Sequence, residues 1–327
     1  MKGKILTIFA LAAVSCSLHP EVEPDFTPAD FRSEVTVKVS GPSTRATGVR
    51  DEDEAAVNSL QVLVFNSDGS IDAVGKGTED SMSINVTAGK GKRLWAVANA
   101  PDLTGVGTED ELCGSITLLT DNSVGNLVMA GNTTADILSD TEVPISLVRI
   151  AAKVTVKQIT RRFSVAGLAA RPLTIKKIYL INVAAGLRLD GTGDATQWLN
   201  RRGFASSGAD ALLSSDSGLD VSLSDGDTYG TAHSFYCYPN PCSTDSAGES
   251  WSPRKTRLVV EAELGGKLCW YSLTFPEILR NRTYTVENLT ISGKGSATPD
   301  TPYGREELSA SVTVRDWTDG SSYTERL

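Results

Sequence analysis

The sequence predicts an all-β protein built from two β-sandwich domains, and three observations favour this fold. Short segments of alternating apolar and polar residues recur along the chain, and turn residues separate them. Gly is abundant at 29 residues, aromatic residues make up only 6%, and no amphipathic pattern longer than two helical turns stands out. A chain of 327 residues suits two domains better than one. Short strands with regular turns are typical of sandwiches.

The chain begins with a segment that is typical of a lipoprotein signal peptide. Lys2 and Lys4 precede the apolar run ILTIFALAAV, which ends just before Cys16. That run is too short to span a bilayer. We therefore expect residues 1–15 to be removed and Cys16 to be acylated, with an ordinary signal peptide as the alternative. Residues 16–33 are rich in proline and acidic residues and are expected to form a tether.

The charge balance and the residue content argue against several function classes. The formal net charge of -9 makes nucleic acid an unsuitable partner. The chain has only two histidines, of which His233 is expected to be structural, and it has no GxSxG motif. The cysteines lack the spacing of a zinc site. We expect no enzyme, no cofactor and no metal.

The first domain is expected to span residues 34–150. Val35, Val37 and Val39 alternate with polar residues and predict a half-buried first strand at 34–41. Gly, Pro, Ser, Thr and charged residues follow, and they predict an exposed loop at 42–56. The next strands are expected at 59–65, 81–88, 93–101 and 143–159, with room for a short helix in 108–141.

The second domain is expected to span residues 151–327. Apolar residues change parity within 143–159, as they would in a strand that leaves one core and enters another. Gly265 and Gly266 predict a hairpin, and the Ser/Asp/Gly-rich residues 200–230 predict a long surface excursion. The strands of this half are expected at 173–183, 233–239, 257–264, 267–275, 282–291 and 308–317.

Cys237 and Cys242 flank the sequence YPNP. Two prolines can turn the chain there, and a disulfide is plausible in an exported protein. Two reduced thiols fit the sequence equally well, because spacing alone does not establish disulfide geometry.

Seven strings, taken in order, resemble the FimA-type fimbrillins of Bacteroidales, the subunits of protease-assembled type V pili. The strings cover most of the chain after the predicted leader, and their order carries the resemblance more than any one of them. They are STRATGVR, LQVLVFNSDG, WAVANAP, LVRIAAKV, FYCYPN, LRNRTYTVENLTISGKGS and VTVRDWTDG.

The resemblance implies a fold, a location and an assembly mechanism. It implies two transthyretin-like β-sandwich domains in tandem, carried to the outer membrane through the lipid and then displayed in a cell-surface fimbria that supports adhesion. An Arg-specific protease would cut the loop after the first strand. That strand would leave, and the C-terminal segment of another subunit would replace it by donor-strand exchange. The implied partners are other copies of the chain, other fimbrial subunits and the protease.

The residues agree with such an exchange. Val35, Val37 and Val39 would fill the groove, and Val312 and Val314 within residues 304–327 would replace them. The string VTVK at 35–38 nearly repeats as VTVR at 312–315, although VTVK also occurs at 154–157. A head-to-tail contact that does not close gives a filament.

Two arginines in the loop are candidate cleavage sites. Arg45 lies among small and polar residues and is followed by Ala46, whereas Arg50 is followed by Asp51 and further acidic residues. An accessible, flexible arginine is the better substrate, so we expect cleavage after Arg45, with Arg50 as the alternative.

Two other functions remain open at this point. The chain could be an anchor or tip adhesin subunit of the same pilus. It could also be a surface lipoprotein that binds polysaccharide, which would need an exposed aromatic platform, but its five tryptophans are scattered along the sequence.

Overall fold

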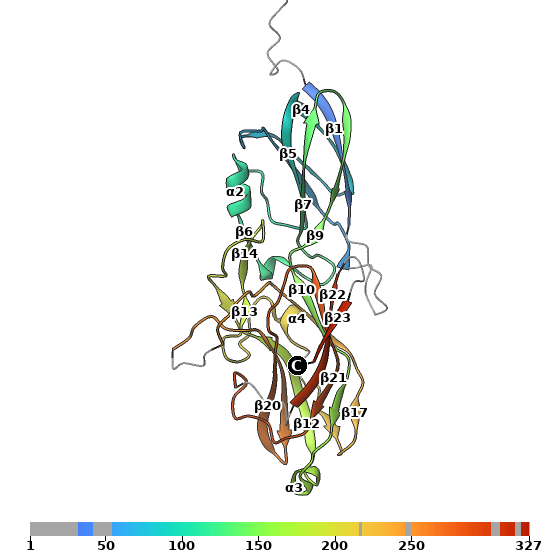
Figure 1. The fold of residues 1–327 in the computed structure, drawn as a ribbon, viewed down its shortest axis with the longest axis vertical. Coiled ribbons are helices and arrows are strands. Elements are labelled where there is room, and N and C mark those ends of the chain that lie inside the picture. The colour runs from blue at the N-terminus through green and yellow to red at the C-terminus, as the bar shows by residue number, and fades with distance from the viewer. Residues whose placement is uncertain are drawn as a thin grey trace, which may run out of the picture.

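A computed structural model of the chain describes residues 32–41, 54–215, 218–245, 250–301, 308–317 and 322–326. Strands in several sheets make up most of it (Figure 1), so the all-β prediction is confirmed. The longest described helix is α2 (Glu109–Gly114), with six residues, in the stretch expected to hold a short helix. Among these residues, no helix has the length and apolar character needed to cross a membrane.

Two sheets form what we call the N-terminal unit, residues 32–149 (Figure 1). The smaller sheet has the order β4 (Ser81–Thr87), β1 (Arg32–Ser40), β8 (Thr141–Ser146). The larger sheet has the order β3 (Ile71–Gly77), β2 (Leu60–Phe65), β5 (Gly89–Ala98), β7 (Met129–Ile137), β9 (Val148–Arg149).

The burial of strand β2 explains why its sequence, LQVLVF, is almost continuously apolar. Leu60, Val62 and Val64 belong to a core cluster whose members all come from the N-terminal unit. Leu63 and Phe65, which alternate with them, belong to a second cluster that continues into the rest of the molecule. Because β2 is buried on both faces, nearly every position along it is apolar.

Three of the remaining sheets in the described part of the chain form the C-terminal unit, residues 152–326. In its larger sheet β21 (Arg282–Ile291) lies between two sets of strands. On one side are β10 (Ala152–Val156) and β11 (Ile159–Arg161), which pair outward with β18 (His233–Cys237) and β17 (Thr228–Tyr229). On the other side are β22 (Leu308–Asp316) and then β23 (Ser322–Arg326). The facing sheet has the order β16 (Val221–Leu223), β12 (Leu173–Ile181), β19 (Arg257–Leu264), β20 (Lys267–Thr274).

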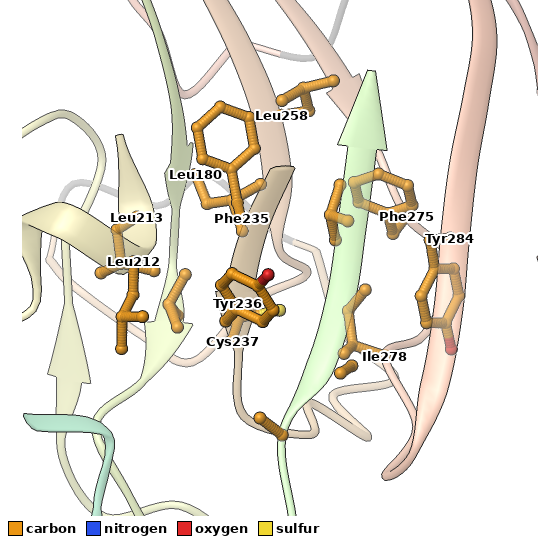
Figure 2. Close-up of a cluster of buried hydrophobic side chains, with 14 of the residues drawn as sticks. Leu180, Leu212, Leu213, Phe235, Tyr236, Cys237, Leu258, Phe275, Ile278 and Tyr284 are labelled. Atoms are coloured by element: carbon orange, nitrogen blue, oxygen red, sulfur yellow. The ribbon is translucent and has the colours of Figure 1, made fainter. Parts of the chain in front are cut away.

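Figure 2 shows the core of the C-terminal unit. Leu180 of β12 and Leu258 of β19 lie close to Phe235 of β18. The segment around α4 (Asp210–Leu213) adds Leu212 and Leu213, which are buried. The expectation of a surface excursion at 200–230 is therefore wrong for α4, because its two leucines close one side of the core.

The chain passes between the two units over a few residues. Arg149 still pairs with β7, whereas Ala152 pairs with β18. One strand crosses back, since β6 (Ile116–Leu118) pairs with β14 (Gly186–Arg188), and one apolar cluster runs through both units. The other short elements are η2 (Leu119–Asp121), α3 (Ala166–Ala169), β13 (Val183–Ala184) and β15 (Trp198–Leu199).

Two turn predictions have opposite outcomes. Gly265 and Gly266 take φ values of 56° and 79°, and the β19–β20 hairpin is confirmed. Cys237 and Cys242 are free thiols, so the disulfide alternative is wrong in this structure. The chain does not turn back at YPNP, because Asn240 continues in an extended bridge with Ile278. Cys237 faces the core while the Cys242 thiol contacts Thr244.

Candidate functional site

Strand β1 is the central strand of its sheet. It runs antiparallel to β4, with Val35 opposite Ile84, and parallel to β8, with Val37 opposite Val143. It begins at Arg32, two residues earlier than expected, because Arg32 already pairs with Thr87. Both edges of β1 are therefore used in backbone hydrogen bonding.

One face of β1 is buried in the core of the N-terminal unit, as the alternation predicted. Val35 and Val37 are 0% exposed and Val39 is 8% exposed. Burying a valine contributes about 1.5–3 kcal/mol, so the three together contribute roughly 5–9 kcal/mol. They pack against apolar residues of both sheets, among them Leu60, Val62, Ile84, Val86, Leu94, Val143 and Ile145.

The other face of β1 makes only surface contacts. The Thr36 and Ser83 hydroxyls are 2.9 Å apart, and Lys38 Nζ lies 2.7 Å from Glu142 Oε2. Both side chains of that ion pair are more than half exposed, so the pair contributes less than about 1 kcal/mol. The apolar face and the backbone therefore hold this strand.

The order of the strands makes β1 separable by one cut. Its neighbours β4 and β8 are distant in sequence, and β2, the next strand along the chain, lies in the other sheet. A cut within 42–53 would leave β1 attached to the following chain by non-covalent contacts alone. Without β1, strands β4 and β8 would face each other across roughly 10 Å, about two strand spacings. Their backbone groups would be unpaired above an apolar floor, and this would be a groove ready for another strand.

The predicted modification residues lie outside the described residues. They are Cys16, Arg45, Ala46, Arg50 and Asp51. Glu54 is described, and it contradicts the expectation that all of 42–56 is exposed, because only 1% of its surface is accessible. Its partners are far away in sequence and gave no local signal.

The expected donor residues lie within the C-terminal unit itself. Val312 and Val314 are 1% and 2% exposed and stand opposite Val286 and Tyr284 of β21. Among the strands that the structure describes, β23 pairs with β22 alone. The segment thus occupies the edge of its own sheet, and donating β22 would require it to leave that edge.

Sequence reasoning missed a buried charged network just before β22. The Asp300 carboxylate accepts from Arg254 Nη1 at 2.5 Å, from Arg257 Nη1 at 2.7 Å and from Asn182 Nδ2 at 2.9 Å. Arg257 Nη2 also donates to Asp245 at 2.9 Å. The members are scattered along the chain, so no motif could have revealed them.

The described residues show the surroundings of His233 and of two of the tryptophans. His233 Nε2 lies 2.9 Å from the Tyr229 hydroxyl, so His233 is a satisfied structural histidine, as expected. Within the described ranges, no cluster of three His, Cys, Asp or Glu residues could hold a metal ion. The ring centroids of Trp198 and Trp251 are 6.1 Å apart. The guanidinium groups of Arg201 and Arg254 lie over the Trp251 ring.

Comparison with known proteins shows which family the first part of the chain resembles. Residues 33–153 match a family model described as major fimbrial subunit protein (FimA). This part of the chain is therefore similar to the FimA family. The match begins within β1 and ends within β10, so it covers the separable strand and its whole sheet.

A curated relative extends the likeness to about half of the chain. A protein of Parabacteroides distasonis, named as a candidate fimbrium tip subunit, Fim1C, is 29% identical over 210 residues. The match spans 53% of this chain and 54% of that relative, so this chain matches only about half of the relative's length.

Solved structures share the fold over most of the chain. A fimbrilin (FimA) from Porphyromonas gingivalis superposes with a TM-score of 0.64 at 15% identity, over 88% of this chain and 98% of that one. A candidate cell adhesion protein from Bacteroides eggerthii gives 0.64 at 22% identity, over 88% and 96%. At these identities the likeness shows the fold alone.

Proposed function

We propose that this chain is a non-enzymatic subunit of a Bacteroidales cell-surface fimbria, polymerised by strand exchange, and that it supports adhesion. The observation that carries the proposal is the position of β1, the first described strand, which is nevertheless central in its sheet. In this proposal the two units, divided near residue 150, are tandem transthyretin-like sandwiches. The family match over β1 and its sheet supports the same reading.

Cleavage acts as the switch in this mechanism. While the loop is intact, β1 fills its own groove at a very high effective concentration, and no strand from another molecule can compete. Once the loop is cut, β1 can dissociate and a strand of matching alternation can replace it. Residues 304–327 of the next subunit would supply that strand through Val312 and Val314, and repetition would build a filament.

The cleavage step is tested with a double substitution in the loop. Arg45→Ala with Arg50→Ala should leave folded monomers that an Arg-specific protease does not convert into fibres. Arg162→Ala removes an exposed arginine elsewhere and should assemble normally. Electron microscopy of protease-treated protein gives the readout. Normal fibres from the double variant would exclude the loop arginines as the switch.

The donor step needs its own variants. Deleting 304–327 should give a cleaved subunit that accepts a strand and cannot donate one. Changing Val312 and Val314 to Asp should have the same effect, because each carboxylate would cost several kcal/mol in an apolar groove. Mixed with wild type, both variants should end fibres rather than extend them. Fibres of normal length from the truncated chain would contradict a C-terminal donor.

A tip position is the second candidate, and the likeness to the candidate tip subunit Fim1C favours it. A tip subunit needs only one side of the exchange, so it would cap a fibre and would not polymerise with itself. Gold-labelled antibody against this chain distinguishes the two positions on native fibres. Labelling along the shaft supports a stalk subunit, whereas labelling at one end supports the tip.

The route to the surface is part of the proposal. Lipidation at Cys16 would carry the precursor to the outer membrane before cleavage releases β1 together with the lipid. Cys16→Ala should remove the protein from the membrane fraction or block its maturation. If the variant fractionates and assembles like wild type, lipidation is not required.

A further inference from the structure

Five side chains meet where the two units join, and we call them the junction cluster: Glu54, Arg149, Lys153, Tyr236 and Trp317. Glu54 is the first described residue after the candidate cleavage sites, and Trp317 directly follows β22. The cluster therefore connects the two segments that the proposed exchange would set in motion.

Glu54 is held by three of these residues. Its Oε1 accepts from Lys153 Nζ at 2.6 Å and from the Tyr236 hydroxyl, and its backbone oxygen accepts from Arg149 Nε at 2.9 Å. Its other carboxylate oxygen is buried and has no hydrogen-bond partner among the described residues. A carboxylate buried in this way depends on its specific partners. Glu54 should therefore separate from these partners when the segment that carries it becomes freer to move.

Two of the residues that hold Glu54 also hold Trp317. The Tyr236 ring stacks on the Trp317 ring with centroids 6.1 Å apart, and the Arg149 guanidinium carbon lies 4.3 Å from the Trp317 ring centroid. Trp317 is buried, and its backbone N–H donates to the Asn281 oxygen at 3.0 Å. Movement of Glu54 would thus reach the end of β22 through Tyr236 and Arg149.

We propose that Glu54 is a latch that keeps β22 and β23 on their own sheet while the cleavage loop is intact. The inference rests on the proposed strand exchange. The intact loop ties Glu54 to β1, which leaves a disengaged Glu54 few conformations. Cutting the loop gives this segment a free end and raises the entropy of the disengaged state. One cut then prepares the acceptor and the donor of the same subunit together.

Hydrogen exchange of the full-length chain tests the latch. The uncleavable Arg45→Ala, Arg50→Ala protein is compared with the same protein carrying Glu54→Gln. The added change should accelerate amide exchange across 308–317 at least about tenfold, to the level of the cleaved wild type. Glu287→Gln is the matched control, because Glu287 on β21 pairs with Lys157 at the surface. It should leave the exchange unchanged.

A purely structural role for Glu54 predicts a different pattern. The latch is already open in the cleaved chain, so Glu54→Gln should change exchange there less than about twofold. Equal acceleration before and after cleavage would overturn the latch. Tyr236→Phe is the second variant, since it removes the hydroxyl that binds Glu54 and keeps the ring over Trp317. It should accelerate exchange only in the uncleaved chain, and unchanged exchange in both variants would also overturn the latch.

A fibre assay separates failure of the latch from failure of the proposed function. The uncleavable Glu54→Gln chain can donate and cannot accept, so it should shorten fibres when added to cleaved wild type. The uncleavable parent should not shorten them. Faster exchange across 308–317 without shortening would support the latch and contradict the C-terminal donor. Unchanged exchange, with normal fibres from wild type, would contradict the latch alone.

Discussion

The first strand and the last two strands that the structure describes are held in opposite ways. β1 is enclosed between β4 and β8, whereas β22 and β23 extend one side of the C-terminal sheet. Both ends bury an alternating set of small apolar residues. The buried faces are therefore similar. The two ends differ in the sheet that would remain after the strand had left.

Loss of β1 would break a sheet in its middle, and loss of β22 would only shorten one. A gap between β4 and β8 leaves two rows of unpaired backbone groups over the core, and these form a template for another strand. Loss of β22 and β23 would make β21 an ordinary edge strand. The end that holds β1 is therefore suited to accept a strand, and the end that holds β22 and β23 is suited to donate one.

The two ends also differ in how firmly the adjoining chain is fixed. Asp300, eight residues before β22, is held by two buried arginines. Among the described residues that follow β1, the first comparable anchor is Glu54. If β22 moves, the motion should begin after Asp300.

Val37→Asp should give the largest effect, and this effect should be confined to the chain before cleavage. Val37 is fully buried, so the intact chain should lose about 5 kcal/mol or more of stability in urea unfolding. After cleavage β1 leaves, and the variant should accept a donor normally. Val312→Asp should lower stability before cleavage, because Val312 is buried in its own unit, and should prevent strand donation after cleavage. Failure of cleaved Val37→Asp to form fibres would show that β1 does not leave.

Asp300→Ala should give the next largest effect. It would leave Arg254 and Arg257 buried without this carboxylate, a change that typically costs about 3–5 kcal/mol. Thermal unfolding measures the loss. Glu287→Ala removes a carboxylate from an exposed ion pair and should cost less than about 1 kcal/mol. A similar small loss for Asp300→Ala would show that the network is not an anchor.

Features set by neighbouring residues could be predicted from the sequence. The alternation of Val35, Val37 and Val39 predicted the buried face of β1, because side chains alternate along any strand. Gly265 and Gly266 predicted a hairpin, because both positions need positive φ. The order of such local signals was enough to suggest the family.

Features set by distant partners could not be predicted. Glu54 lies in an acidic run that looks solvated, and its burial depends on Lys153 and Tyr236, which are 99 and 182 residues away. Leu212 and Leu213 lie in a Ser/Asp/Gly-rich stretch, and their burial depends on the core they cover. The turn expected at YPNP is absent for the same reason, because Asn240 pairs in an extended bridge with the distant Ile278.

The two thiols near YPNP should differ in reactivity. Burial raises the pKa of the Cys237 thiol to about 12. Only a trace of it is thiolate at pH 8, and the thiolate is the reactive form. Iodoacetamide should label half-buried Cys242 in the folded chain, and Cys237 only after unfolding. Mass spectrometry without reductant measures both, and failure of both to label in denaturant would indicate a disulfide.

Lys38→Ala should give the smallest effect. It tests whether the surface ion pair or the apolar face holds β1 in place. Lys38 and Glu142 are 55% and 56% exposed, so losing their ion pair should cost less than about 1 kcal/mol. Salt near 1 M should remove even that difference. The uncleaved variant should keep β1 in place, because Val35, Val37 and Val39 hold the strand from the other face. Urea unfolding at two salt concentrations, with electron microscopy of the uncleaved protein, provides the measurement. Fibres from uncleaved Lys38→Ala would mean that a surface charge retains β1, and the apolar account of the exchange would then be wrong.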